Sequence, residues 1–77
     1  MENQELLKLY LSLPGEQREK RFADTARTAE ITGLSRRTIQ FWIEVGAIKA
    51  ISIGRKYRVD LDSLTAYLSV QLEKQNG

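Results

Sequence analysis

Two sets of helix start and stop signals stand close together in the middle of this 77-residue chain. Asp24 can accept hydrogen bonds from the first N–H groups of a helix over Thr25–Thr32, and Gly33 suits the left-handed residue that often follows a helix. Ser35 offers the same kind of start to a second helix over residues 36–45. The chain is therefore expected to form two short helices with a tight turn between them.

The second predicted helix has one apolar face. Ile39, Trp42 and Ile43 fall at positions i, i+3 and i+4, so we expect them to lie in the core, and Gly46 would end the helix. The joint over residues 33–35 is short and contains glycine, as between the two helices of a helix-turn-helix. Helical pairs of this kind also occur in proteins that never bind nucleic acid, so the pattern alone does not define a function.

A β-hairpin is predicted after these helices. Residues 51–53 and 57–59 alternate apolar and polar side chains, and residues 54–56 would form the turn between them. We expect the four apolar residues to share the inward face: Ile51, Ile53, Tyr57 and Val59. Ser52 and Arg58 would then lie on the outer face. An isolated hairpin is only marginally stable, so this one must dock on the helices as the wing of a winged helix-turn-helix.

The ends of the chain are predicted to be helical. Apolar residues are frequent from Glu2 to Leu13, and Pro14-Gly15 would end that helix. Residues 16–21 carry five charges of mixed sign and suit a solvated linker or an exposed helical turn. At the other end, Asp60 would cap a last helix from Leu61 to about Lys74.

These elements predict a mainly α fold with a small β-hairpin. Residues 1–21 would form an N-terminal helix and linker, and residues 22–77 a winged helix-turn-helix domain. The apolar residues of the first helix could form a dimer surface or pack within the chain against leucines of the last helix. The two sets are Leu6, Leu7, Tyr10 and Leu13 in the first helix, and Leu64, Leu68 and Leu72 in the last.

Positive charge is concentrated between residues 35 and 58. This block contains six Lys and Arg residues against one Glu, a net charge of +5, whereas the whole chain carries +2. The basic residues are Arg36, Arg37, Lys49, Arg55, Lys56 and Arg58. A basic block of this density indicates a polyanionic partner if it maps onto one face of the fold.

Composition excludes several classes of function. The chain has no Cys and no His, so disulfide scaffolds, zinc fingers, haem ligation and thiol or Ser-His catalysis lose their key side chains. Asp60-x-Asp62 lacks the glycine and distal glutamate of a calcium loop. We therefore expect no enzyme, no metal site and no cofactor.

The longest apolar runs contain three residues, as in Phe41-Trp42-Ile43, far below the roughly 20 needed to span a bilayer. The first residues do not form an export signal. We therefore expect no membrane partner and a soluble, cytoplasmic protein of bacterial, phage or mobile-element origin.

Four motifs occur in a fixed order between Phe22 and Leu68. They are the Gly-Leu-Ser-Arg-Arg-Thr-Ile turn, the Trp-Ile-x-x-Gly helix end, the Ile-Gly-Arg-Lys-Tyr-Arg wing and the Ala-Tyr-Leu segment. Together they resemble the excisionase-type and MerR-type winged-helix DNA-binding domains. Two positions depart from that family, which usually has a polar or basic residue at Phe41 and an acidic residue near Arg27. The resemblance does not extend to residues 1–21.

The resemblance implies sequence-specific binding to double-stranded DNA. Helix 36–45 would enter the major groove, and the wing over residues 51–59 would contact the backbone or the neighbouring minor groove. The predicted DNA-binding residues are Ser35, Arg36, Arg37, Thr38, Gln40, Phe41, Arg55, Lys56 and Arg58. The implied role is that of an excisionase, which directs a recombinase partner, or of a small transcriptional regulator. Homodimers or arrays on DNA would suit either role.

Several of these residues have a competing structural interpretation. Ser35 would cap its helix, and Trp42 and Tyr57 would fill the core rather than stack on bases. For Phe41 we favour packing against the N-terminal helix or a partner protomer over contact with a thymine methyl. The alternative function is that of a protein-interaction adaptor or antitoxin-like module whose basic face binds an acidic protein.

Overall fold

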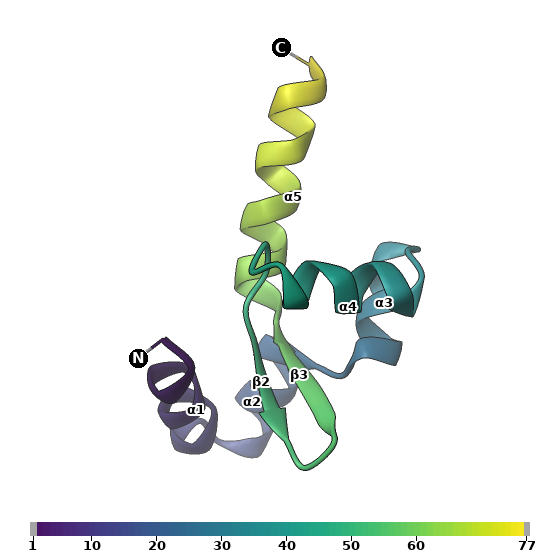
Figure 1. Ribbon diagram of the computed structural model, residues 1–77. Helices are drawn as coiled ribbons and strands as arrows, with labels where there is room; N and C mark the ends of the chain where they lie inside the picture. Colours follow the sequence, from purple (N-terminus) through teal and green to yellow (C-terminus); the bar gives the residue numbers. More distant parts are fainter. Residues whose placement is uncertain (1, 77) are drawn as a thin grey trace.

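The computed structural model describes residues 2–76, in which five helices surround a small antiparallel sheet (Figure 1). The elements are α1 (Glu2–Ser12), α2 (Gly15–Arg21), β1 (Phe22–Ala23), α3 (Thr25–Thr32), α4 (Arg36–Glu44), β2 (Ala50–Ile53), β3 (Lys56–Asp60) and α5 (Leu61–Asn76). The sheet order is β1-β3-β2. The predicted mainly α winged helix-turn-helix is confirmed. Residues 16–21 lie in α2, so the helical one of their two predicted alternatives is the one that forms.

The helix caps predicted around the central turn are present. The backbone N–H of Arg27 donates to Asp24 Oδ1 over 2.8 Å, and the backbone N–H of Thr38 donates to Ser35 Oγ over 3.1 Å. Gly33 has a φ of 74°, a conformation that glycine adopts without steric cost. These local interactions fix where α3 ends and α4 begins.

The apolar face of α4 forms the larger core, as predicted. Ile39 is completely buried, and Trp42 and Ile43 are half-buried against the same cluster. The Trp42 and Tyr67 rings meet edge to face with centroids 5.0 Å apart. The other buried members of this cluster are Ile48, Val59 and Leu64.

The turn between β2 and β3 contains two residues, Gly54 and Arg55. Lys56 already belongs to the sheet, where it is paired with Ile53, so the predicted three-residue turn is wrong by one position. Gly54 has a φ of 64°, which suits the tight turns that close two-residue hairpin loops. The shorter turn changes the register of the whole hairpin.

The prediction that the four apolar residues of the hairpin share one face is wrong. Directly opposite residues of an antiparallel pair point to the same side of the sheet, and the pairs here are Ile51 with Arg58 and Ala50 with Val59. Because successive residues alternate, Ile51 lies on one face and Val59 on the other. The common face expected for Ser52 and Arg58 is wrong for the same reason.

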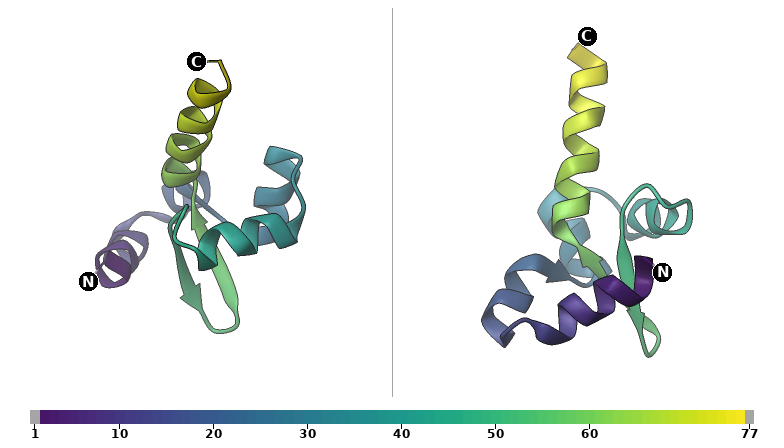
Figure 2. Two further views of the ribbon diagram at one scale, coloured as in Figure 1. Left: turned by 45° about the horizontal axis from the view of Figure 1, so that its top comes forward. Right: turned by 90° about the vertical axis from the view of Figure 1, so that its left-hand side faces the viewer.

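Helix α1 covers the second face of the sheet. A smaller cluster forms there from Leu6, Phe22 and Ile51, each no more than 9% exposed, with Tyr10 and other α1 residues beside it. Figure 2 shows α1 crossing the hairpin. The packing of α1 against the last helix, one of the two sequence alternatives, is therefore wrong, because these residues pack on the sheet.

Asp60 starts α5, as predicted. Its Oδ1 accepts the backbone N–H of Asp62 over 3.2 Å and the Nε of Arg21 over 3.3 Å. Arg21 also lies 3.5 Å from the Asp62 carboxylate, so one guanidinium is paired with both acids of the Asp-x-Asp sequence. This pairing gives both acids a structural role at the start of α5.

Among its described side chains, helix α5 packs on the larger core through those of its first half. Leu64 is buried, and Leu61 and Leu68 are half-buried against the larger core. Beyond them the helix projects away from the rest of the molecule (Figure 1), and Leu72 is 60% exposed. No helix within residues 2–76 has the length and apolar character needed to cross a membrane.

Two neighbouring substitutions on α4 test its orientation. Ile39→Ala should lower the free energy of unfolding by about 2–5 kcal/mol, because it leaves a cavity in a fully buried site. Phe41→Ala, the matched control on the exposed side, should change it by less than about 0.5 kcal/mol. Urea denaturation measures both, and equal losses would contradict the assigned core face.

Candidate nucleic-acid interface

The outer surface of α4 presents polar and aromatic side chains that take no part in the core. Arg36, Arg37 and Gln40 are exposed on this surface, as predicted from the apolar face opposite. Phe41 is also exposed, with 57% of its surface accessible. The expectation that Phe41 packs on the N-terminal helix is therefore wrong, whereas packing against a second protomer stays a prediction.

Helical periodicity orders these side chains around α4. At 100° per residue, Arg37 and Phe41 lie almost directly opposite the buried face, and Arg36 and Gln40 lie to one side of them. The sequence prediction missed Glu44, which is exposed on the same outer surface at the C-terminal end of the helix. The same helical period that identified the core face could have predicted the position of Glu44.

The start of α4 is electropositive. Its first turn contains no acidic residue and begins with Arg36 and Arg37, next to the positive end of the helix dipole. Ser35 and Thr38 hold this end together, because their hydroxyl oxygens lie 3.0 Å apart and Ser35 also accepts the backbone N–H of Thr38. The capping role predicted for Ser35 is confirmed, and the first turn of α4 favours anions.

The tip of the wing carries two further cations. Arg55 lies in the turn and Lys56 is the first residue of β3, and both are exposed. Figure 1 shows the tip projecting beyond α3 and α4, in the direction opposite to α5. Four of the six basic residues of the block thus lie on two exposed parts, the outer surface of α4 and the tip of the hairpin, whereas Lys49 is exposed at the other end of the hairpin beside Ser63.

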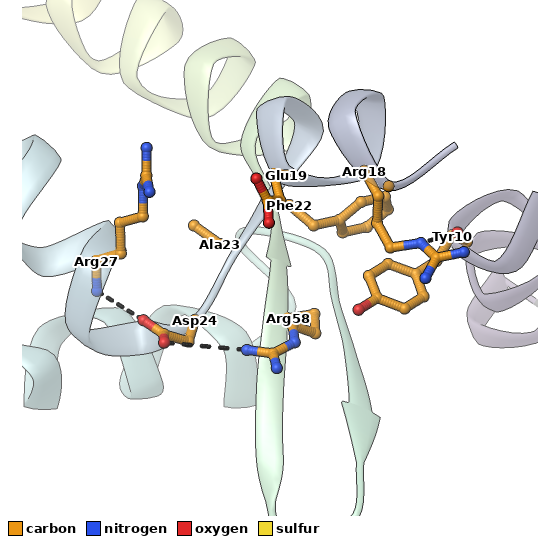
Figure 3. Close-up of a pocket in the computed structure, with 9 residues that line it drawn as sticks. Tyr10, Arg18, Glu19, Phe22, Ala23, Asp24, Arg27 and Arg58 are labelled. Carbon is orange, nitrogen blue, oxygen red and sulfur yellow. Dashed lines mark hydrogen bonds and ion pairs between the residues drawn. The ribbon is translucent and has the colours of Figure 1, made fainter. Parts of the chain in front are cut away.

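Arg58 lies apart from these two groups. Its guanidinium lies 4.0 Å from the carboxylate of Asp24, and its side chain is 35% exposed. Because Arg58 is opposite Ile51, it lies on the face of the sheet that α1 covers. There it lines a hollow of about 430 Å³ together with Tyr10 and Arg27 (Figure 3). Of the three predicted wing cations, Arg58 thus lies beside Asp24 and not at the tip.

The corrected register identifies wing residues that the sequence prediction missed. Ser52 is paired with Tyr57, two residues along each strand from the pair of Ala50 and Val59 that points to the larger core. Ser52 and Tyr57 therefore lie on the side of the wing that faces the helix-turn-helix; Ser52 is exposed and Tyr57 is half-buried. The two-residue turn is the signal that could have revealed this.

Among the residues that the structure describes, no three acidic side chains come close enough together to bind a metal ion. The exposed groups on α4 and at the wing tip are cations, an amide, an aromatic ring and, at the C-terminal end of α4, the carboxylate of Glu44. These groups suit recognition of phosphates and base edges.

Comparison with known proteins identifies one family. A family described as a helix-turn-helix domain matches residues 24–70, which include α3, α4, the hairpin and the first part of α5. No curated protein and no solved structure matches the chain. The match covers well over half of the chain and leaves α1 and α2 outside it.

Proposed function

This chain belongs to the excisionase-type helix-turn-helix family of DNA-binding proteins, and we propose that it binds a specific sequence of double-stranded DNA. In this proposal α4 enters the major groove, the wing follows the backbone or the adjacent minor groove, and residues 22–77 form the DNA-binding part. The single observation that carries the proposal is the outer surface of α4, where arginine, glutamine and phenylalanine side chains are exposed opposite a buried apolar face.

Base recognition is assigned to Arg37, in the middle of the outer surface of α4, and to Gln40 beside it. Arg37 would donate two hydrogen bonds to a guanine, and Gln40 would pair with an adenine, each contributing about 1–3 kcal/mol of discrimination. Arg36 lies beyond Gln40, the farthest of the three from the middle of the outer surface, and is proposed to contact a phosphate. This division follows from the rotational order of the three side chains around the helix.

Phosphate contacts are assigned to the start of α4 and to the wing tip. The electropositive first turn of α4 suits one phosphate, and Ser35 and Thr38 would contact it from the cap. Arg55 and Lys56 would contact phosphates on the other side of the groove. If about five phosphates are neutralised per protomer, the logarithm of affinity should fall with the logarithm of salt concentration with a slope of about −4.5.

The role of the bound protein is proposed to be excision or transcription control. Excisionase-like proteins bend attachment-site DNA and direct a recombinase, whereas small regulators of the same fold act at promoters. A single module of this kind buries only about 600–1,000 Å² on DNA, so two protomers or an array would share a site. Gel mobility of DNA with the site at varied positions distinguishes a strong bend from a straight complex.

Selection of bound sequences from random duplex DNA tests the proposed function directly. Groove reading by α4 should enrich a common motif, and repeated copies at a fixed spacing would report a pair or an array. The alternative function, binding of an acidic protein through charge alone, gives no preferred sequence. Competition between the enriched duplex and bulk DNA at constant salt then measures specificity, and equal competition by both would refute base readout.

Two single substitutions distinguish a side chain that recognises a base from one that contacts a phosphate. Arg37→Ala should weaken binding to the selected duplex by about 5- to 150-fold, with a much smaller effect on bulk DNA. Lys56→Ala, the matched loss of one cation at the wing tip, should weaken both by similar factors and lower the magnitude of the salt slope by about 0.9. Titrations of both duplexes at several salt concentrations measure these effects. Similar patterns for the two variants would contradict groove reading by Arg37.

Phe41 is proposed to contact the methyl group of a thymine. It is exposed beside Arg37 in the middle of the outer surface of α4, and apolar contact with this methyl group is a known mode of major-groove reading. Replacing that thymine by uracil removes only the methyl group and should weaken wild-type binding about fourfold, from about 0.8 kcal/mol per buried carbon.

The Phe41→Ala protein provides the control for this measurement. It should bind the thymine and uracil duplexes equally well, because it lacks the side chain that contacts the methyl group. Each thymine of the selected site is replaced in turn. If no replacement distinguishes the wild type from Phe41→Ala, the proposed contact is wrong.

A further inference from the structure

We infer that α1 and α2 position the wing, and that Leu6 and Arg18 are positioning residues for its contact with DNA. We call the packing of α1 and α2 against the hairpin the brace. Its effect on DNA binding rests on the proposed function, whereas the brace itself follows from the contacts within the chain. Both helices lie outside the residues that match the helix-turn-helix family.

The hairpin has two apolar faces, and only one belongs to the helix-turn-helix core. Val59 points into the cluster around Ile39, whereas Ile51 points to the opposite side and is only 3% exposed. Its cover there comes from Leu6 of α1 and from Phe22 of β1. Because removing an isoleucine side chain from water is strongly favourable, α1 supplies much of what holds this face of β2 in place.

Arg18 of α2 holds α1 in its orientation. Its guanidinium donates to three carbonyl oxygens at the C-terminal end of α1, over 2.8 Å to Tyr10, 3.2 Å to Leu11 and 3.1 Å to Leu13. The carbonyl groups in the last turn of a helix have no N–H donors within the helix, so Arg18 supplies partners that they would otherwise lack. The same guanidinium lies 4.7 Å from the centre of the Tyr10 ring.

The brace connects back to the sheet through aromatic packing. The rings of Tyr10 and Phe22 meet edge to face with centroids 5.0 Å apart, as Figure 3 shows beside Arg18. Phe22 follows α2 directly and is paired in the sheet with Asp60. Helix α1, helix α2 and the sheet therefore form one closed set of contacts on the side of the hairpin away from α4.

This arrangement bears on the wing tip because the tip lies far from the buried part of the hairpin. Ile53, two residues beyond Ile51 and about 7 Å farther along the strand, is already 41% exposed, and the turn that carries Arg55 lies beyond it. A small rotation of the hairpin at Ile51 thus displaces the tip cations from their phosphates. A braced wing needs less ordering on binding, which is the usual benefit of preorganisation.

The experiment measures the coupling between the brace and the wing tip in the full chain. Leu6→Ala and Arg18→Gln weaken the brace at two separate places, and Leu11→Ala changes a 62% exposed side chain on the same helix as a control. Each substitution is made in the wild type and in a protein that carries both Arg55→Ala and Lys56→Ala. Titrations with the selected duplex at several salt concentrations give affinities and salt slopes.

In the wild-type background, Leu6→Ala and Arg18→Gln should each weaken DNA binding by about 2- to 10-fold and lower the magnitude of the salt slope. They should have no effect once Arg55 and Lys56 are replaced, and Leu11→Ala should have none in either background. Equal losses in both backgrounds, or none in the wild type, would overturn the inference.

A second readout does not depend on DNA. Amide hydrogen exchange over residues 52–57 should be faster in Leu6→Ala and Arg18→Gln, whereas exchange in α4 should stay as in the wild type. The fluorescence of Trp42, the single tryptophan, reports on the larger core and verifies that it is intact. Unchanged exchange at the wing would refute the brace. If the two variants show faster exchange at the wing but the wild-type protein has no preferred DNA sequence, only the proposed function is refuted.

Discussion

The register of one hairpin determines how the whole molecule is assembled. A two-residue turn at Gly54 and Arg55 places Val59 and Ile51 on opposite sides of the same ribbon, and each side then needs an apolar cover. The helix-turn-helix covers one side and α1 covers the other. A three-residue turn would have placed the four apolar residues of the hairpin on a single face, and α1 would have had no Ile51 to cover. The number of residues in this turn is therefore a property of the fold as a whole.

The same register distributes the positive charge. Arg55 and Lys56 end at the free tip, but Arg58 is held on the covered side near Asp24. An ion pair of this length between half-exposed groups contributes about 0–1 kcal/mol, so the strand and not the carboxylate decides where Arg58 lies. On α4 the charge is distributed by the helical period instead. The two exposed basic groups are thus a consequence of backbone geometry, to which individual charge pairs add little.

Local signals were enough to predict the helices from the sequence. The capping residues Asp24 and Ser35 and the apolar spacing around Ile39 identified α3, α4 and the outer surface of α4, because each signal acts within a few residues. The face of each hairpin residue and the packing of Phe41 were not predictable in this way. Gly54-Arg55-Lys56 is compatible with a turn of two or three residues, and the leucines of α1 show that a partner exists without identifying it. Which residues touch DNA stays a prediction.

The last helix and the hairpin tip point in opposite directions from the core (Figure 1). If the tip and α4 face a duplex, the second half of α5 extends away from it, with Lys74 near its end. A fluorescent label or a purification handle joined there would be held clear of the nucleic acid. The protein can therefore be tethered to a sensor surface through this helix with its basic side free in solution.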